Sequence, residues 1–182
     1  TLSLHDALPI FATWSFEGAS DLVTTGGASV GDHDLVKPAL ARFGLTLTVE
    51  TVAVRPGKPT WFGTLADGRR VLGLPGNPAS AFVCAELFLR PLLAALQGGD
   101  ARLPMFGVRS AEAMGPAGPR EHWMRGALET GPDGDLVARA FSDQESSLVS
   151  VFAVSDALVR RGGGAPALDA GDVVEVLPLP RA

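Results

Sequence analysis

Short apolar runs, each followed at once by a turn rich in glycine or proline, dominate the first half of the chain. Leu22-Val23 leads into a glycine-containing stretch over residues 24–34, and Val71-Leu72-Gly73-Leu74 leads into a Pro-Gly-Asn-Pro turn at residues 75–78. A helix-like segment follows each turn. The pattern predicts two strand–turn–helix units, which are typical of α/β sheets.

The second of these helices is expected to run from about Pro78 to Leu96. Asn77 is a suitable N-cap residue, and Pro78 suits the first helical position, where its missing N–H has no consequence. Pro91 is expected to kink the helix near its middle, and Gly98-Gly99 to end it.

The residue types of the first turn are those of an anion site. Glycine lets the backbone approach a ligand closely, and exposed N–H groups then point at phosphate oxygens. Asp32 and Asp34 are acceptors for a cation such as Mg²⁺ beside a phosphate. An ordinary strand-to-helix turn with an N-capping aspartate explains this run alone equally well, because it matches neither the Walker A spacing nor G-x-G-x-x-G.

A proline-bracketed loop between the two turns carries two cations, Arg55 and Lys58. Arg55 can grip a phosphate bidentately, whereas Lys58 acts as a point charge. Two solvated loop cations are the alternative for this pair taken by itself. Three loops that each follow a strand-like run favour a ligand cleft, because parallel sheets place their ligands at the carboxyl ends of the strands.

The pattern changes after Gly99 to short strand-like runs separated by turns. They cover residues 105–108, 121–128, 136–140 and 173–177, and Pro132-Asp133-Gly134-Asp135 is a hairpin signal. Short strands at this spacing predict a small β domain of about 80 residues, near the lower limit for an independent core.

Three ordered motifs carry a family resemblance. Thr-Thr-Gly-Gly-Ala-Ser-Val-Gly-Asp-His-Asp from Thr24, Arg-Pro-Gly-Lys-Pro from Arg55 and Leu-Pro-Gly-Asn-Pro-Ala-Ser from Leu74 resemble the molybdopterin molybdenumtransferases, the bacterial counterparts of the gephyrin C-terminal region. The resemblance covers about residues 20–182. It implies a three-layer, mostly parallel α/β sheet domain of the molybdopterin-binding type, truncated at its N-terminus and covering residues 11–98, followed by a small β-barrel-like domain over residues 99–182.

The resemblance also implies an enzyme that inserts molybdate into adenylylated molybdopterin and releases AMP, with Mg²⁺ assisting. The catalytic positions fall on Asp34, Arg55 and Lys58, and Asp32 joins Asp34 as a metal ligand. The substrate-binding positions are Thr25, Gly26, Gly27, Ser29, Gly31, Pro75, Gly76, Asn77, Pro78, Ser80, Arg125 and Ser146.

Arg125 and the run Gln144-Glu145-Ser146-Ser147 align with positions that the family places facing the pterin site across a dimer. The resemblance makes Arg125 an anion contact and Ser146 a hydroxyl that lines the pocket. Taken without the resemblance, the residues favour an exposed strand arginine and a turn of serines.

Two segments depart from the family pattern. Thr51 stands where many members carry a lysine, so one positive charge is missing near the expected site. Residues 1–10 fit neither the family nor a clean element and are expected to be a foreign or misread segment. The alternatives in function are a non-catalytic binding or scaffolding module of the same fold, or a molybdopterin adenylyltransferase relative, against which the trailing β domain and the Arg-Pro-Gly-Lys-Pro loop argue.

Composition and charge limit the kinds of partner and site that this chain is expected to have. A net charge of −5 argues against nucleic acid as the main partner. The single cysteine, Cys84, excludes an internal disulfide and is expected to be a buried small hydrophobe, and with His5, His33 and His122 alone a zinc site is not expected. No apolar run reaches the roughly 18 residues that span a bilayer, so a cytoplasmic protein without a membrane partner is expected. A homodimer is expected, with a molybdopterin adenylyltransferase and molybdoenzyme-assembly proteins as further partners.

Overall fold

The computed structural model describes residues 21–26, 35–144 and 150–180. The chain divides into two compact units. The first comprises Thr1–Val52 and Gly57–Cys84, and the second comprises Ala53–Pro56 and Ala85–Ala182. The domain limits drawn from the sequence at residues 10 and 98 stay predictions.

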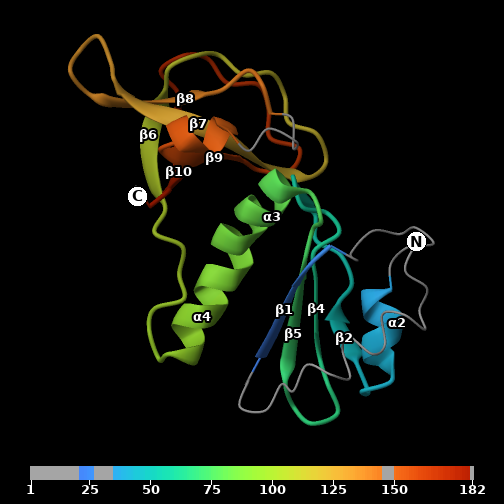
Figure 1. Cartoon of the computed structure of the whole chain (residues 1–182). Helices are drawn as coiled ribbons and strands as arrows, with labels where there is room; N and C mark the ends of the chain where they lie inside the picture. Colours follow the sequence, from blue (N-terminus) through green and yellow to red (C-terminus); the bar gives the residue numbers. More distant parts are fainter. Residues whose placement is uncertain (1–20, 27–34, 145–149, 181–182) are drawn as a thin grey trace. The chain divides into compact units, whose positions relative to one another are not determined.

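A four-stranded sheet forms the centre of the first unit (Figure 1). Its order is β1 (Asp21–Thr25), β5 (Arg70–Leu74), β4 (Trp61–Thr64) and β2 (Thr46–Val49). β1 and β5 are parallel, whereas β4 is antiparallel to both β5 and β2. The expected α/β class is confirmed, but over the described strands the sheet is mixed rather than mostly parallel. The reason is the tight turn between β4 and β5, closed by Leu65 N–H donating to Arg69 O at 2.8 Å, because a connection this short joins only antiparallel strands.

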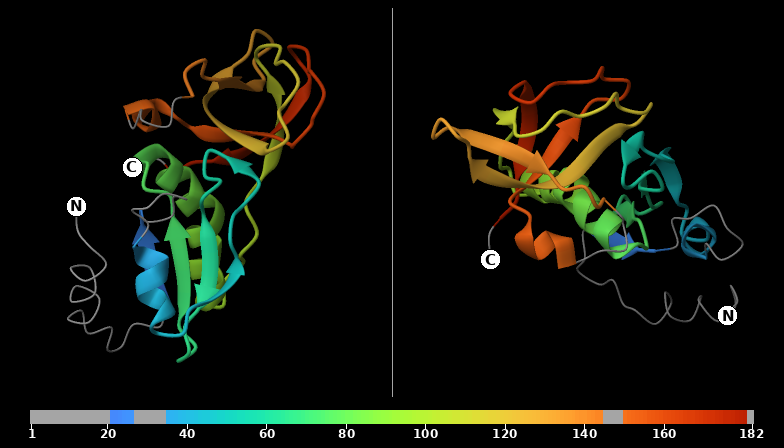
Figure 2. Two further views of the ribbon diagram at one scale, coloured as in Figure 1. Left: turned by 90° about the vertical axis from the view of Figure 1, so that its right-hand side faces the viewer. Right: turned by 90° about the horizontal axis from the view of Figure 1, so that it is seen from above.

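Helices lie on both faces of this sheet, with α2 (Val36–Ala41) on one side and α3 (Pro78–Cys84) on the other (Figures 1 and 2). On the side of α2 the buried core is made by Leu40, Trp61, Leu65 and Val71. The Trp61 indole lies over its cross-strand partner Gly73, where a Cβ atom would meet the ring at 2.0 Å. Gly73 is therefore the residue that lets the tryptophan pack flat on the sheet.

The helix predicted from Pro78 to Leu96 is confirmed. It consists of α3, a π-helical segment η1 (Ala85–Leu89) and α4 (Arg90–Leu96). Pro91 has no N–H, and in a regular α-helix its ring would clash with the carbonyl group of Leu87, so a wider turn just before it relieves the conflict. The irregularity thus lies where the proline predicted it.

This helix corrects one expectation about apolar runs. With 19 residues it is long and apolar enough to cross a membrane by length and composition, and it is the one such helix in the described part of the chain. Core helices of soluble proteins pass the same test, so a single helix of this kind is weak evidence for a membrane span.

The second unit contains a closed five-stranded barrel. Around it the order is β7 (Glu121–Thr130), β8 (Leu136–Ala140), β6 (Phe106–Ser110), β10 (Val173–Pro178) and β9 (Ala157–Arg161), which pairs again with β7. The short strand β3 (Val54–Arg55) adds to β7 in parallel, and a 3₁₀ turn, η2, spans Ser150–Val154. The barrel core consists of Val108, Ala138, Ala157, Val159, Val174 and Val176. The predicted β-barrel-like domain is confirmed, including its hairpin, where Gly131 N–H donates to Asp135 O at 2.7 Å.

The contact between Trp61 and Gly73 yields a stability prediction. Gly73→Ala should lower the free energy of unfolding by about 2 kcal/mol or more, because the new methyl group overlaps a fully buried ring. Urea denaturation followed by tryptophan fluorescence would measure it. Gly115→Ala is the matched control, since a Cβ there meets nothing within 4 Å and should change stability by less than about 0.5 kcal/mol. Equal stability of the two variants would contradict the packing argument.

Candidate functional site

Two of the predicted loops meet at one edge of the sheet in the first unit. β1 and β5 are parallel neighbours with Thr25 opposite Leu74, so the turns that follow them leave the sheet together. Gly26 N–H donates to Leu74 O at 3.1 Å, and a Cβ on Gly76 would lie 3.1 Å from the Cα of Gly26. Gly26 also has φ +83°, a conformation that side chains disfavour. Glycine at both positions lets the two backbones come into contact.

The third loop reaches the same edge by a different route. β4 is antiparallel to β5, with Trp61 opposite Gly73, so the residues just before β4 lie at the end where β5 finishes. Lys58 belongs to these residues and is exposed. The loop follows a strand, β3, as the sequence predicted, but β3 belongs to the other sheet. Lys58 lies at this edge because its loop also precedes the antiparallel strand β4.

A buried hydrogen-bond network holds this loop in place. The hydroxyl of Thr60 lies 2.8 Å from Gly57 O, to which it donates, and 3.1 Å from the Cys84 Sγ. Burial raises the pKa of the Cys84 thiol to about 11, so it stays protonated at neutral pH. Cys84 is therefore the buried side chain that the sequence predicted, and it also anchors the loop on α3, which the sequence did not predict.

The Pro-Gly-Asn-Pro turn is closed by its asparagine. Asn77 Oδ1 accepts hydrogen bonds from the Ser80 backbone N–H at 3.2 Å and from the Ser80 hydroxyl at 3.4 Å, and α3 begins at Pro78. The N-cap prediction is confirmed. Pro75, Gly76 and Asn77 thus form a rigid rim at the edge where Gly26 lies, while the buried Ser80 helps to cap the helix.

In the second unit Arg125 lies on β7 and is 3% exposed, so it is not the exposed strand arginine that the residues alone suggested. Gln144 Oε1 accepts from the Arg125 backbone N–H at 2.9 Å, and Gln144 Nε2 donates back to Arg125 O at 2.9 Å. The guanidinium carbon lies 5.4 Å from the centre of the Phe152 ring. Burial lowers the pKa of Arg125, and the nearby Asp143 carboxylate opposes that shift. Arg125 and Gln144 thus contact each other directly. The roles predicted for Arg125 and for the run that starts at Gln144 at a pterin site stay predictions.

Six predicted site residues lie outside the described part of the chain: Gly27, Ser29, Gly31, Asp32, Asp34 and Ser146. Within the described residues, no group of three or more histidine, cysteine or acidic side chains is placed to hold a metal ion. The Mg²⁺ site on Asp32 and Asp34 stays a prediction.

Sequence reasoning did not assign a role to His122, which pairs in register with Arg55 across β7 and β3. Burial lowers the pKa of His122 to about 4, and the positive charges of Arg55 and Arg120 contribute. No sequence motif marks His122, because its environment forms only when β3 pairs with β7.

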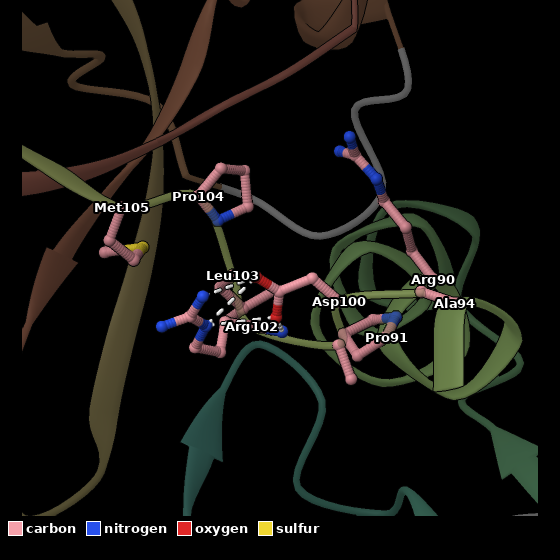
Figure 3. Close-up of a pocket in the computed structure, with 9 residues that line it drawn as sticks. Arg90, Pro91, Ala94, Asp100, Arg102, Leu103, Pro104 and Met105 are labelled. Atoms are coloured by element: carbon pink, nitrogen blue, oxygen red, sulfur yellow. Dashed lines mark hydrogen bonds and ion pairs between the residues drawn. The ribbon is translucent and has the colours of Figure 1, made fainter. Parts of the chain in front are cut away.

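A hollow of about 540 Å³ in the second unit is lined by none of the predicted site residues (Figure 3). It is lined by Arg90, Pro91, Ala94, Asp100, Ala101, Arg102, Leu103, Pro104 and Met105. Arg102 donates to Asp100 Oδ2 at 2.7 Å, while the Arg90 side chain points away from that pair. Arg102 and Asp100 form an ion pair with each other. Neither charge of this pair is therefore left to bind a ligand in the hollow.

Two protein families match this chain in succession. The family described as a probable molybdopterin binding domain matches residues 4–95. The family described as the MoeA C-terminal region (domain IV) matches residues 108–179.

Individual relatives and a solved structure also match the chain. The chain is 32% identical over 166 residues to the molybdopterin molybdenumtransferase of Haemophilus influenzae, a match covering 90% of this chain and 41% of that one. It is 40% identical over 111 residues to the molybdopterin molybdenumtransferase of Synechococcus elongatus, covering 60% of this chain and 27% of that one. The crystal structure of a molybdopterin biosynthesis MoeA protein from Pyrococcus horikoshii superposes with a TM-score of 0.74 at 25% identity, covering 97% of this chain and 41% of that one. The chain thus spans about two fifths of the length of the Haemophilus relative.

The depressed pKa of His122 predicts how stability depends on pH. The folded protein binds the His122 proton only near pH 4, whereas the unfolded chain binds it at the ordinary value of 6.5. Protons therefore favour the unfolded state in this window, and the free energy of unfolding should fall as the pH drops from about 6.5 to about 4. Carboxylates titrate in the same pH range, so the wild-type protein is compared with His122→Gln. The free energy of unfolding of this variant, measured with urea, should depend less steeply on pH. Identical slopes for the two proteins would rule out this contribution.

Proposed function

The chain belongs to the molybdopterin molybdenumtransferase family, and we propose that it supplies part of the site at which molybdate is inserted into adenylylated molybdopterin with release of AMP. The activity is proposed for a protein of the relatives' length, because this chain spans 41% of the Haemophilus relative. The observation that carries the proposal is the meeting of three loops, around Gly26, Lys58 and Gly76, at one edge of the sheet in the first unit.

The chemistry of this edge suits the proposed substrate. Adenylylated molybdopterin is planar at its pterin and anionic at its pyrophosphate, so it requires close backbone approach and positive charge rather than an apolar pocket. Gly26 and Gly76 have no side chain, so a ligand can approach their backbone closely. Thr25 adds an exposed hydroxyl, and Lys58 adds an exposed ammonium group. The rim of Pro75, Gly76 and Asn77 is held by the helix cap, which limits the ordering that binding would require.

The remaining roles extend the proposal to residues that the family resemblance assigns. Asp34 acts in catalysis and holds Mg²⁺ together with Asp32, and when bound the ion neutralises charge on the phosphate oxygens. Arg55 binds a phosphate, and Arg125 with Ser146 contributes to the pterin site from a second copy of the chain. The threonine at position 51 leaves this site one charge weaker than in relatives with lysine there.

The same proposal includes a setting for the protein. We expect a cytoplasmic homodimer, because Arg125 is assigned to the partner's site in this arrangement. A molybdopterin adenylyltransferase would supply the substrate, since adenylylation must precede release of AMP, and molybdoenzyme-assembly proteins would take the product.

Calorimetric titration of this chain with adenylylated molybdopterin, with and without Mg²⁺ and molybdate, tests the proposed location. Lys58→Ala should weaken binding by about tenfold or more, because it removes a charge-assisted contact to the anion. Arg102→Gln is the matched control, since Arg102 is 89% exposed and lies outside the three loops. A well-folded sample that binds nothing would favour the scaffolding alternative, and equal affinities of wild type and Lys58→Ala would remove Lys58 from the site.

Asp34→Ala should abolish metal-dependent transfer in a protein of the relatives' full length that carries this segment, while far-UV circular dichroism stays unchanged. The carboxylate is the proposed metal ligand, so its loss removes the ion as well as the acid. Steady-state AMP release at several Mg²⁺ concentrations would measure the effect, with Asp100→Asn as a variant outside the proposed site. Wild-type rates in Asp34→Ala would exclude Asp34 from the mechanism.

A further inference from the structure

A row of basic side chains crosses the second unit where three strands pair. Arg55 of β3 is in register with His122 of β7, and His122 is in register with Arg161 of β9. Side chains paired in register project from the same face of a sheet. Arg120 acts electrostatically on His122, as Arg55 does, so it lies close to the same row. We call Arg55, Arg120, His122 and Arg161 the basic row.

The basic row has no carboxylate partner among the described residues. None of the ion pairs found there includes Arg55, Arg120 or Arg161. The acidic residues nearby are engaged by Arg160, which donates to Glu121 at 2.7 Å and to Glu175 at 2.6 Å. Strand alternation places Arg160 on the opposite face from Arg161, so these carboxylates leave the basic row uncompensated.

Arg161 provides a second, independent observation. Its side chain is buried, and Nη2 donates to the carbonyl oxygens of Gly115, at 3.3 Å, and of Pro166. Nη1 is also buried but has no hydrogen-bond partner among the described residues. A guanidinium group stays charged, and a buried donor left unsatisfied costs about 1–3 kcal/mol. The described residues therefore supply no acceptor for this donor of the basic row.

The loops around the basic row hold it in a defined place. Gly164 N–H donates to Gly118 O at 2.8 Å, and a Cβ on Gly163 would lie 2.6 Å from Pro119 O. The two loops that carry Arg120 and Arg161 are therefore packed against each other. Cations held in this way lose little freedom when a ligand binds.

We propose that the basic row is a binding site for a phosphate-class oxyanion. Arg55 and Arg120 contact it from the exposed side, Nη1 of Arg161 donates from the buried side, and the neutral His122 ring donates an N–H between them. Arginine forks match the oxygen geometry of a tetrahedral anion, and three cations suit a doubly charged phosphate better than a single carboxylate. The site shares Arg55 with the proposed transfer reaction and goes beyond it, because Arg120, His122 and Arg161 have no role assigned there.

Titration of the 182-residue chain with inorganic phosphate, followed by calorimetry and by the NMR signals of the His122 ring, tests this proposal. Saturable binding is expected, together with a rise in the His122 pKa from about 4, because a bound anion offsets the charges of Arg55 and Arg120. Arg120→Gln should weaken binding by about fivefold or more, and it should fold normally because Arg120 is exposed.

Arg102→Gln is the matched control, because it removes one exposed charge outside both proposed sites and should leave phosphate binding unchanged. Arg120 and Arg161 have no role in the proposed transfer site, so loss of phosphate binding in Arg120→Gln tests this proposal separately from that one. Arg161→Met removes the buried donor and should also weaken phosphate binding. If Arg161→Met does not fold, Arg120→Gln still tests the proposal. If glycerol phosphate binds as tightly as inorganic phosphate, the anion is a phosphate monoester. If glycerol phosphate does not bind, the anion is a free one. Absence of saturable binding, equal losses in Arg102→Gln and Arg120→Gln, or an unchanged His122 pKa would overturn the proposal.

Discussion

The parallel pairing of β1 with β5 is the constraint on which the candidate site depends. It makes two turns that are distant in the sequence leave the sheet side by side, so Gly26 donates to the carbonyl of Leu74 and its backbone meets that of Gly76. Any side chain at these positions would separate the turns or strain φ at Gly26. The antiparallel pairing of β4 with β5 places Gly73 under the Trp61 ring. Core packing and the candidate site thus share one strand, β5, which is buried over most of its length.

Strand direction, rather than strand order alone, decides where the cationic loop lies. Because β4 runs against β5, Lys58 arrives at the same edge from the start of a strand. The buried hydroxyl of Thr60 and the protonated thiol of Cys84 then hold that loop against α3. A neutral, satisfied anchor of this kind fixes the position of a charged residue without burying the charge itself.

Three arginines of the barrel in the second unit have different surroundings. Arg125 is buried against Gln144 and Phe152, Arg160 is satisfied by two glutamates, and Arg161 retains a buried donor with no partner among the described residues. Since a guanidinium group stays ionised when buried, each arrangement requires compensation from its surroundings. The first two find it within the described chain, whereas the third is the basis of the proposed oxyanion site.

The sequence by itself determined the local elements: the helix over Pro78–Leu96 with its asparagine cap and its irregularity before Pro91, the hairpin at residues 131–135, and the change from an α/β segment to a small β domain. These follow from interactions between residues close in the chain, which residue types and spacing encode directly. Only the tertiary structure decided the mixed direction of the sheet, the burial of Arg125 and the alignment of Arg55, His122 and Arg161. Those features depend on which strands pair and in which register, a property of the whole fold that no local pattern specifies.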